Sequence, residues 1–123
     1  PLRQLPKYWP SAGKRTDVAA TNGTALDAGA ASTFGFAAFL HVFAFTGTSV
    51  TVKLQESSDN GGGDAFAAVV GGGFTVVAAA PASQRIAATP ASLERYVRVV
   101  TTGTFSSCVF AVVLVRHQSA VNL

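Results

Sequence analysis

This 123-residue chain has little charge and almost no cysteine or histidine. Charged residues make up 12% of it and hydrophobic residues 49%, a composition too apolar for a disordered chain. The single cysteine excludes an internal disulfide, and one cysteine with two histidines is too few for an ordinary zinc site. A domain this small has much surface and few charges to cover it. We therefore expect part of that surface to be buried against other chains.

The residues that carry enzyme chemistry are also scarce. No Gly-x-Ser-x-Gly motif is present, and Cys108 lies inside the apolar stretch 108–115, where a thiol is buried and inert. His41 lies among aromatic residues, which predicts a partly buried strand position, and His117 is expected to be exposed. The sequence therefore predicts a protein that is not an enzyme and holds no cofactor.

Three carboxylates gather around one glycine-rich stretch, at Glu56, Asp59 and Asp64. Calcium favours oxygen-rich loops, but this spacing does not fit the EF-hand pattern, and polar hairpin loops have the same composition. The glycines do not form a phosphate loop, because no Lys-Ser or Lys-Thr pair follows them. We expect a solvated loop that holds no metal.

Positive charge is concentrated in the first 15 residues, which hold four of the nine basic side chains and no acid. The rest of the chain holds five basic and six acidic side chains and is nearly neutral. A basic segment on a neutral body suits an acidic protein surface, and it also suits a solvated tail, so both interpretations remain open. Four basic residues neutralise only a few phosphates, so nucleic acid is not expected to be the partner.

The segment 1–23 is predicted to be an extended arm. Three prolines within its first ten residues disfavour both a helix and the interior of a sheet. It also carries the only tryptophan, and Tyr and Trp are enriched where one protein anchors on another. The alternative is that these rings fold back on their own domain. The predicted protein interface is Arg3, Lys7, Tyr8, Trp9, Lys14 and Arg15.

Residues 24–118 are typical of strands separated by turns, and 119–123 form a short tail. Turns are expected at 46–48 and 102–104, and the triple glycine 71–73 predicts a turn between two strands rather than a membrane span. No helical stripe of adequate length is present. The pattern predicts an all-β fold, a single antiparallel β-sandwich of the immunoglobulin-like or jelly-roll-like kind. The expected strands are 39–45, 50–55, 66–70, 74–78, 84–87, 93–101 and 105–115.

Two of these strands are apolar on both faces. In 39–45, we expect Leu40 and Val42 to face one way and the three phenylalanines to face the other. In 109–115, valines and alanine on one face oppose Phe, Val and Leu on the other. A strand with one wet face alternates cleanly between apolar and polar residues. The outer faces are therefore expected to be covered by the arm, a loop or another subunit.

Several stretches resemble the β-sandwich module of tailed-bacteriophage structural proteins. The resemblance spans residues 14–116 and includes a strand that ends in Gln-x-Ser-x-Asp at 55–59 and a later Arg-Tyr-x-Arg strand at 95–98. It implies a structural protein of the virion, assembled in the cytoplasm of the bacterial host. The implied partner is the major capsid or tail protein in a symmetric, multi-copy or homo-oligomeric assembly, without a membrane. The stretches are 20–24, 43–60, 84–87, 95–99 and 101–107.

The N-terminus distinguishes this chain from the tail form of the module. A short proline-rich arm stands where the tail form has a large tube-forming domain. This favours a separate capsid decoration or cement protein. A tail-associated structural protein and a receptor- or glycan-binding module remain the alternatives.

Overall fold

The computed structural model describes residues 14–88 and 91–117, and of residues 7–10 it describes the backbone. All the regular structure in these ranges is β-strand. The eight strands are β1 (Lys7–Pro10), β2 (Arg15–Asp17), β3 (Thr21–Asn22), β4 (Leu26–Asp27), β5 (Phe36–Ser57), β6 (Ala67–Gly73), β7 (Ala82–Ala88) and β8 (Tyr96–Arg116).

Two long strands form the centre of the fold. β5 and β8 pair antiparallel along their whole length, from Phe36 opposite Arg116 to Ser57 opposite Tyr96. Every other strand pairs with one of these two: β1 to β4 with β8, and β6 and β7 with β5. The result is one antiparallel sheet, and the all-β, antiparallel prediction is confirmed.

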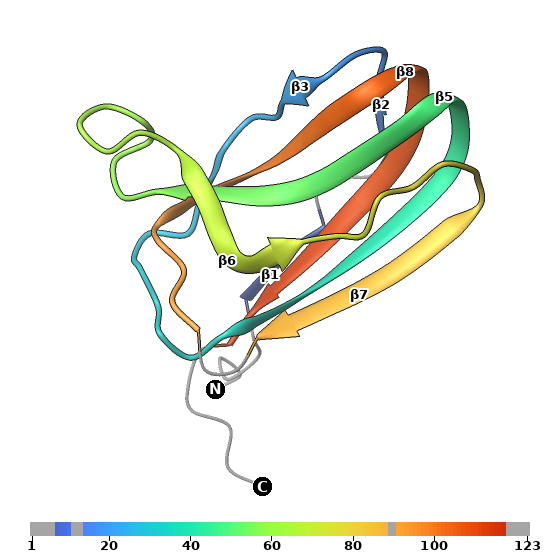
Figure 1. Cartoon of the computed structure of the whole chain (residues 1–123). Helices are drawn as coiled ribbons and strands as arrows, with labels where there is room; N and C mark the ends of the chain where they lie inside the picture. The colour runs from blue at the N-terminus through green and yellow to red at the C-terminus, as the bar shows by residue number, and fades with distance from the viewer. Residues whose placement is uncertain (1–6, 11–13, 89–90, 118–123) are drawn as a thin grey trace, which may run out of the picture.

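The sheet folds back on itself to make the two layers of a sandwich. The β5–β8 ladder is irregular between Val42 and Ser49, and Figure 1 shows the two strands bending together at this corner. Layer A contains β1, β2, β7 and the segments 36–45 and 106–116 of the long strands. Layer B contains β3, β4, β6 and the segments 49–57 and 96–104.

The predicted turns at 46–48 and 102–104 are wrong, because both strands continue through them. Gly47 has φ 150° and Gly103 has φ 131°, a backbone region that L side chains rarely adopt. A Cβ at Gly47 would lie 2.4 Å from the Cα of Phe105, and one at Gly103 would lie 2.4 Å from the carbonyl oxygen of Ser49. These glycines therefore allow two backbones to approach at a corner, whereas the same sequence signal is typical of a reversing turn.

The core lies between the two layers. Layer A contributes the inward side chains of alternating residues, such as Phe36, Leu40 and Phe110, and layer B contributes residues such as Val52 and Leu54. All five are at most 1% exposed. Burial of a side chain of this size stabilises the fold by about 1.5–3 kcal/mol, so this cluster is the main source of stability.

The irregularity in β5 also changes which phenylalanines face outward. Leu40 and Val42 point into the core as expected, and Phe39 and Phe43 lie on the opposite side. Phe45, however, packs against the core and lies 6.2 Å from the ring of Phe105. The extra residue between Val42 and Ala44 shifts the period-two alternation, so the prediction that all three phenylalanines share a face is wrong.

The triple glycine is not a turn between two strands. Gly71, Gly72 and Gly73 form the end of β6, whereas the sequence prediction ended this strand at residue 70, and the predicted strand 74–78 contains only an isolated bridge at Val77. The following residues stay beside layer B, where Phe74 donates its N–H to the carbonyl of Val52 at 3.0 Å. The side-chain amide of Gln84 then bonds both the N–H and the C=O of Thr75, at 2.7 and 2.8 Å, and closes this side of the sandwich.

Much of the predicted arm belongs to the sheet. The register places Tyr8 opposite Val115 and Trp9 opposite Leu114, and β2 and β3 extend the same edge of β8. Pairing with β8 therefore continues across the expected boundary at residue 23, from β3 to β4. The C-terminal tail 119–123 lies outside the described residues.

We predict that Gly103→Ala destabilises the protein by about 2–3 kcal/mol, because the new Cβ meets the backbone of Ser49 at a positive φ. Urea denaturation followed by circular dichroism measures the change. Gly73→Ala is the control, since no atom lies within 4 Å of its Cβ position. Equal stability of the two variants would contradict the corner interpretation.

Candidate interaction surface

The outward side of layer A is mainly apolar. We call it the apolar face and define it by Ala37, Phe39, Phe43, Val109, Ala111, Val113 and Val115. Residues of the two central strands lie directly opposite one another across this face, so their side chains form a continuous surface. The pairs are Ala37 with Val115, Phe39 with Val113, His41 with Ala111 and Ala44 with Val109.

The apolar face is only partly covered by the chain itself. Phe43 is 50% exposed, and Phe39, Val113 and Val115 are half-buried. The opposite side of the same strands is closed core, where Leu40 and Val112 are at most 2% exposed. Layer A therefore has two apolar sides, one inside the fold and one on the surface.

Polar groups border the apolar face. The guanidinium of Arg85 on β7 lies 5.8 Å from the centre of the Phe39 ring, and the ammonium of Lys14 lies 6.0 Å from the ring of Phe43. His41 stacks on Phe43 with ring centres 6.3 Å apart. It is exposed, and its Nδ1 shares a 3.0 Å hydrogen bond with the hydroxyl of Ser83, so the expectation of a partly buried histidine is wrong.

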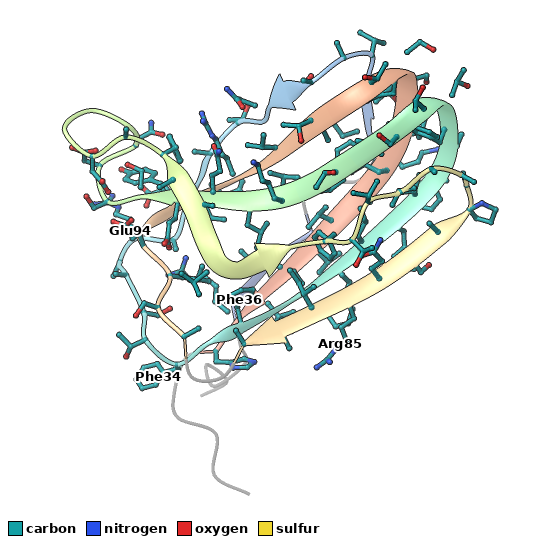
Figure 2. All side chains as sticks on the ribbon, viewed as in Figure 1. Phe34, Phe36, Arg85 and Glu94 are labelled. Atoms are coloured by element: carbon teal, nitrogen blue, oxygen red, sulfur yellow. The ribbon has the colours of Figure 1, made fainter. Side chains whose placement is uncertain are left out.

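The carboxylates of the described residues lie away from this face. Asp17 is buried between the layers, and Asp27 pairs with Arg95 at the edge of layer B. The others gather near the loop that joins β5 to β6. In Figure 2, Arg85 projects from β7, and Glu94 lies at the opposite side of the view, near that loop. The border of the apolar face is therefore basic. The gathered carboxylates are Glu56, Asp59, Asp64 and Glu94.

The predicted interface residues do not lie on one common surface. Lys14 is exposed at the border of the apolar face. The backbones of Lys7, Tyr8 and Trp9 pair with the end of β8, beside the same face, and their side chains lie outside the described residues. Arg3 also lies outside them.

Arg15 joins the two layers instead of facing outward. Its guanidinium donates to both oxygens of Asp17 at 2.8 Å and to the carbonyl of Val99 at 3.0 Å, and it lies 4.9 Å from the ring centre of Phe110. The hydroxyl of Thr101 donates to Asp17 at 2.6 Å. Asp17 is 4% exposed, so this ion pair and its hydrogen bonds close the side of the sandwich opposite Gln84.

We predict that Asp17→Asn destabilises the fold by about 2–3 kcal/mol, because it leaves a partly buried guanidinium without its counter-charge. Asp27→Asn is the matched control. Asp27 makes the same two-point contact with Arg95, at 2.7 and 2.9 Å, but both side chains are more than 40% exposed. We expect a much smaller loss there. Similar urea midpoints for both variants would contradict a structural role for Arg15.

The acidic loop is held together by its own side chains. The hydroxyl of Ser57 accepts the N–H of Gly61 at 2.8 Å and donates to the carbonyl of Asp64 at 2.6 Å. Backbone N–H groups of Asp64 and Gly63 donate to the carboxylate of Asp59 and lower its pKa. Within the described ranges, no group of three or more Asp, Glu, His and Cys residues is placed to hold a metal ion. These carboxylates thus organise the loop.

Glu94 has the opposite electrostatics. Desolvation raises its pKa, and the neighbouring carboxylates of Asp64, Glu56 and Asp59 raise it further. The folded state then binds a proton more tightly than the unfolded state, so Glu94 reduces stability as pH rises above its ordinary pKa. Asp59, with a lowered pKa, stabilises the fold at neutral pH and ceases to do so on acidification.

We predict that Glu94→Gln raises the urea midpoint at pH 7 and that this gain shrinks towards pH 4, where the Glu94 carboxyl is mostly protonated in both the folded and the unfolded state. Asp59→Asn should change stability in the opposite direction at pH 7. Parallel denaturation curves at pH 4 and pH 7 measure both effects. A gain for Glu94→Gln that does not depend on pH would exclude this electrostatic cause.

Groups suited to catalysis are far apart or occupied. Cys108 is buried as expected, and burial followed by the nearby charge of Asp17 raises its pKa, which disfavours the reactive thiolate. His41 borders the apolar face and pairs with Ala111 across the ladder. His117 follows the end of β8, is half-buried and shares a 3.2 Å hydrogen bond with the carbonyl of Phe34.

The described residues include no helix long and apolar enough to cross a membrane.

Comparison with known proteins gives remote similarities in structure. No protein-family model and no curated protein matches the sequence. The SPBc2 prophage-derived protein YomS is 9% identical with a TM-score of 0.47, over 94% of this chain and 99% of that one. PirA is 12% identical with a TM-score of 0.47, over 84% and 93% of the two chains. A Bacillus endospore appendage protein of disulfide-linked pili is 16% identical with a TM-score of 0.37, over 95% and 92%. Likenesses at this level do not fix a function.

Proposed function

We propose that this protein is a non-enzymatic structural component of a bacteriophage particle, and more specifically a capsid decoration or cement protein. The observation that carries the proposal is the apolar face, because its basic border and its distance from the described carboxylates suit a docking surface. The resemblance of residues 14–116 to β-sandwich modules of tailed phages supports the choice of particle. In this proposal the partner is a major subunit with an apolar patch and acidic groups around it.

The energetics of such docking follow from the composition of the face. Burial of apolar surface contributes about 25 cal/mol per Å², and a standard interface buries about 800 Å² on each partner. Lys14 and Arg85 at the border add orientation and association rate more than affinity. Many copies on a symmetric shell make weak single contacts effective together, so each copy needs only moderate affinity.

The N-terminal segment extends the proposed interface. β1 adds the backbone of residues 7–10 to the edge of layer A. Lys7, Tyr8 and Trp9 therefore pair with the end of β8, next to the apolar face. In the proposal these residues and Arg3 contact the same neighbouring subunit. Arg15 contributes indirectly, because its ion pair with Asp17 and its bond to the carbonyl of Val99 attach β2 of layer A to layer B.

We predict that Phe43→Glu weakens binding to particles by at least about tenfold, since it places a charge in the area that docking would bury. Val76→Glu is the matched control, because Val76 is 55% exposed, as Phe43 is 50% exposed, but it lies outside the apolar face. Co-sedimentation of the purified full chain with particles of the phage that encodes it, followed by gel densitometry, measures the affinity.

Circular dichroism and urea midpoints confirm that both variants fold. Equal binding by Phe43→Glu and Val76→Glu would contradict docking through the apolar face. Binding of the chain to an immobilised glycan, with no binding to the particle, would replace the proposal with the receptor- or glycan-binding alternative.

A further inference from the structure

A small cavity opens at the end of the sandwich where β8 finishes. It has a volume of about 170 Å³ and is lined by Ala28, Ala30, Ala31, Ser32, Phe34, Arg116 and His117. Alanine and phenylalanine side chains give it apolar walls, and Ser32, Arg116 and His117 are its polar lining residues. A cavity of about 150 Å³ admits a guest the size of benzene, so this one has room for a small organic group.

A buried guanidinium lines the cavity. Arg116 is 2% exposed and continues the inward alternation of Val112 and Leu114. Its Nη1 donates to the carbonyl of Glu94 at 3.0 Å, and its Nη2 donates to the carbonyls of Leu93 and Ala30 at 3.2 and 3.3 Å. These bonds hold the 28–32 and 93–94 segments together at this end of the sandwich.

Among the residues that the structure describes, no carboxylate forms an ion pair with Arg116. The ion pairs among the described residues are Arg15 with Asp17 and Arg95 with Asp27, and Glu56 acts on Arg116 only through the longer-range field. Burial lowers the pKa of Arg116. Buried charges in proteins are normally paired, so the site is complementary to an anion.

Ser32 connects the guanidinium to the cavity. Its hydroxyl oxygen accepts the N–H of Arg116 Nη2 at 3.2 Å, which leaves the hydroxyl hydrogen able to donate to a guest. A hydroxyl that accepts from a cation becomes a stronger donor. The ring of His117 lies at the same cavity, with its Nδ1 3.2 Å from the carbonyl of Phe34.

We propose that this cavity binds a carboxylate group, with Arg116 supplying the charge and Ser32 supplying a polar contact. A carboxylate fits better than a phosphate, because it carries one charge to match one guanidinium and the apolar walls can receive a short hydrocarbon part. The carboxylate can come from a free small acid or from an Asp, Glu or C-terminal residue of a neighbouring polypeptide. The inference does not depend on the proposed role in a phage particle.

Acetate and acetamide are matched probes for this site, since they have nearly the same shape and differ in charge. Titration of the ¹⁵N-labelled full chain at pH 7 and constant ionic strength, with sodium chloride as the balancing salt, should give saturable amide shifts at residues 28–34 and 116–117 with acetate. Acetamide should give none. The absence of a saturable response to acetate, or an equal response to acetamide, would overturn the proposal.

Ser32→Ala tests the polar contact without removing the buried charge. We expect acetate to bind about five- to tenfold more weakly, because one charge-assisted hydrogen bond is lost. Ser106→Ala is the control, since this exposed serine bonds the carbonyl of Thr46 and does not line the cavity. Equal acetate affinity in the two variants would contradict a contact between Ser32 and the bound carboxylate.

A short alanine peptide with a free C-terminus and the same peptide with a C-terminal amide distinguish the two sources. Binding of the free acid as tight as acetate or tighter indicates a polypeptide carboxylate, and binding of acetate alone indicates a free acid. Phe43→Glu, which tests the particle-docking proposal, lies outside the cavity lining and should leave the acetate shifts unchanged. The two proposals can therefore fail separately.

Discussion

The pairing of β5 with β8 determines the rest of the structure. Each strand runs through both layers, so a single ladder supplies the two central strands of layer A and the two of layer B. The glycines at the corner allow the ladder to bend without a break, because their missing side chains let the two backbones approach. The core forms where the inner sides of the bent ladder face each other, and the remaining strands add to its edges.

Polar side chains close the parts of the sandwich that the ladder leaves open. Arg15, Asp17 and Thr101 join the layers on one side, and Gln84 replaces a missing backbone partner for Thr75 on the other. Arg116 does the same at one end. A chain with few charges thus uses several of them inside the fold, which leaves a surface with less polar cover than its composition already implies.

The sequence predicts the local structure better than the connections between elements. Alternation in 108–115 correctly identifies a strand with two apolar sides and a buried Cys108, since side-chain period alone decides these points. The sequence cannot distinguish Thr-Gly-Thr at a turn from the same motif at a corner. A reversing turn and a corner where two backbones approach both require glycine. The inward direction of Phe45 depends on an irregularity in pairing with a distant strand, which no local pattern records.

The candidate surfaces show the same division. The apolar face was visible in the two-sided strands, but its basic border comes from Arg85, whose place opposite Phe39 depends on the β5–β7 register. The role of Arg15 was missed, although its spacing of two from Asp17 places both on one side of a strand. Arg116 was missed as well, and the alternation of Phe110, Val112 and Leu114 was a signal that it points inward.

The order of the strands along the chain has a consequence for synthesis. β1, β2, β3 and β4 all pair with β8, which comes last among the eight strands. While the ribosome is still translating residues before 96, these four segments have no partner, and β5 lacks the neighbour along most of its length. The central ladder and the core between its layers can therefore form only after β8 has been synthesised, and the apolar segments of the nascent polypeptide stay exposed until then.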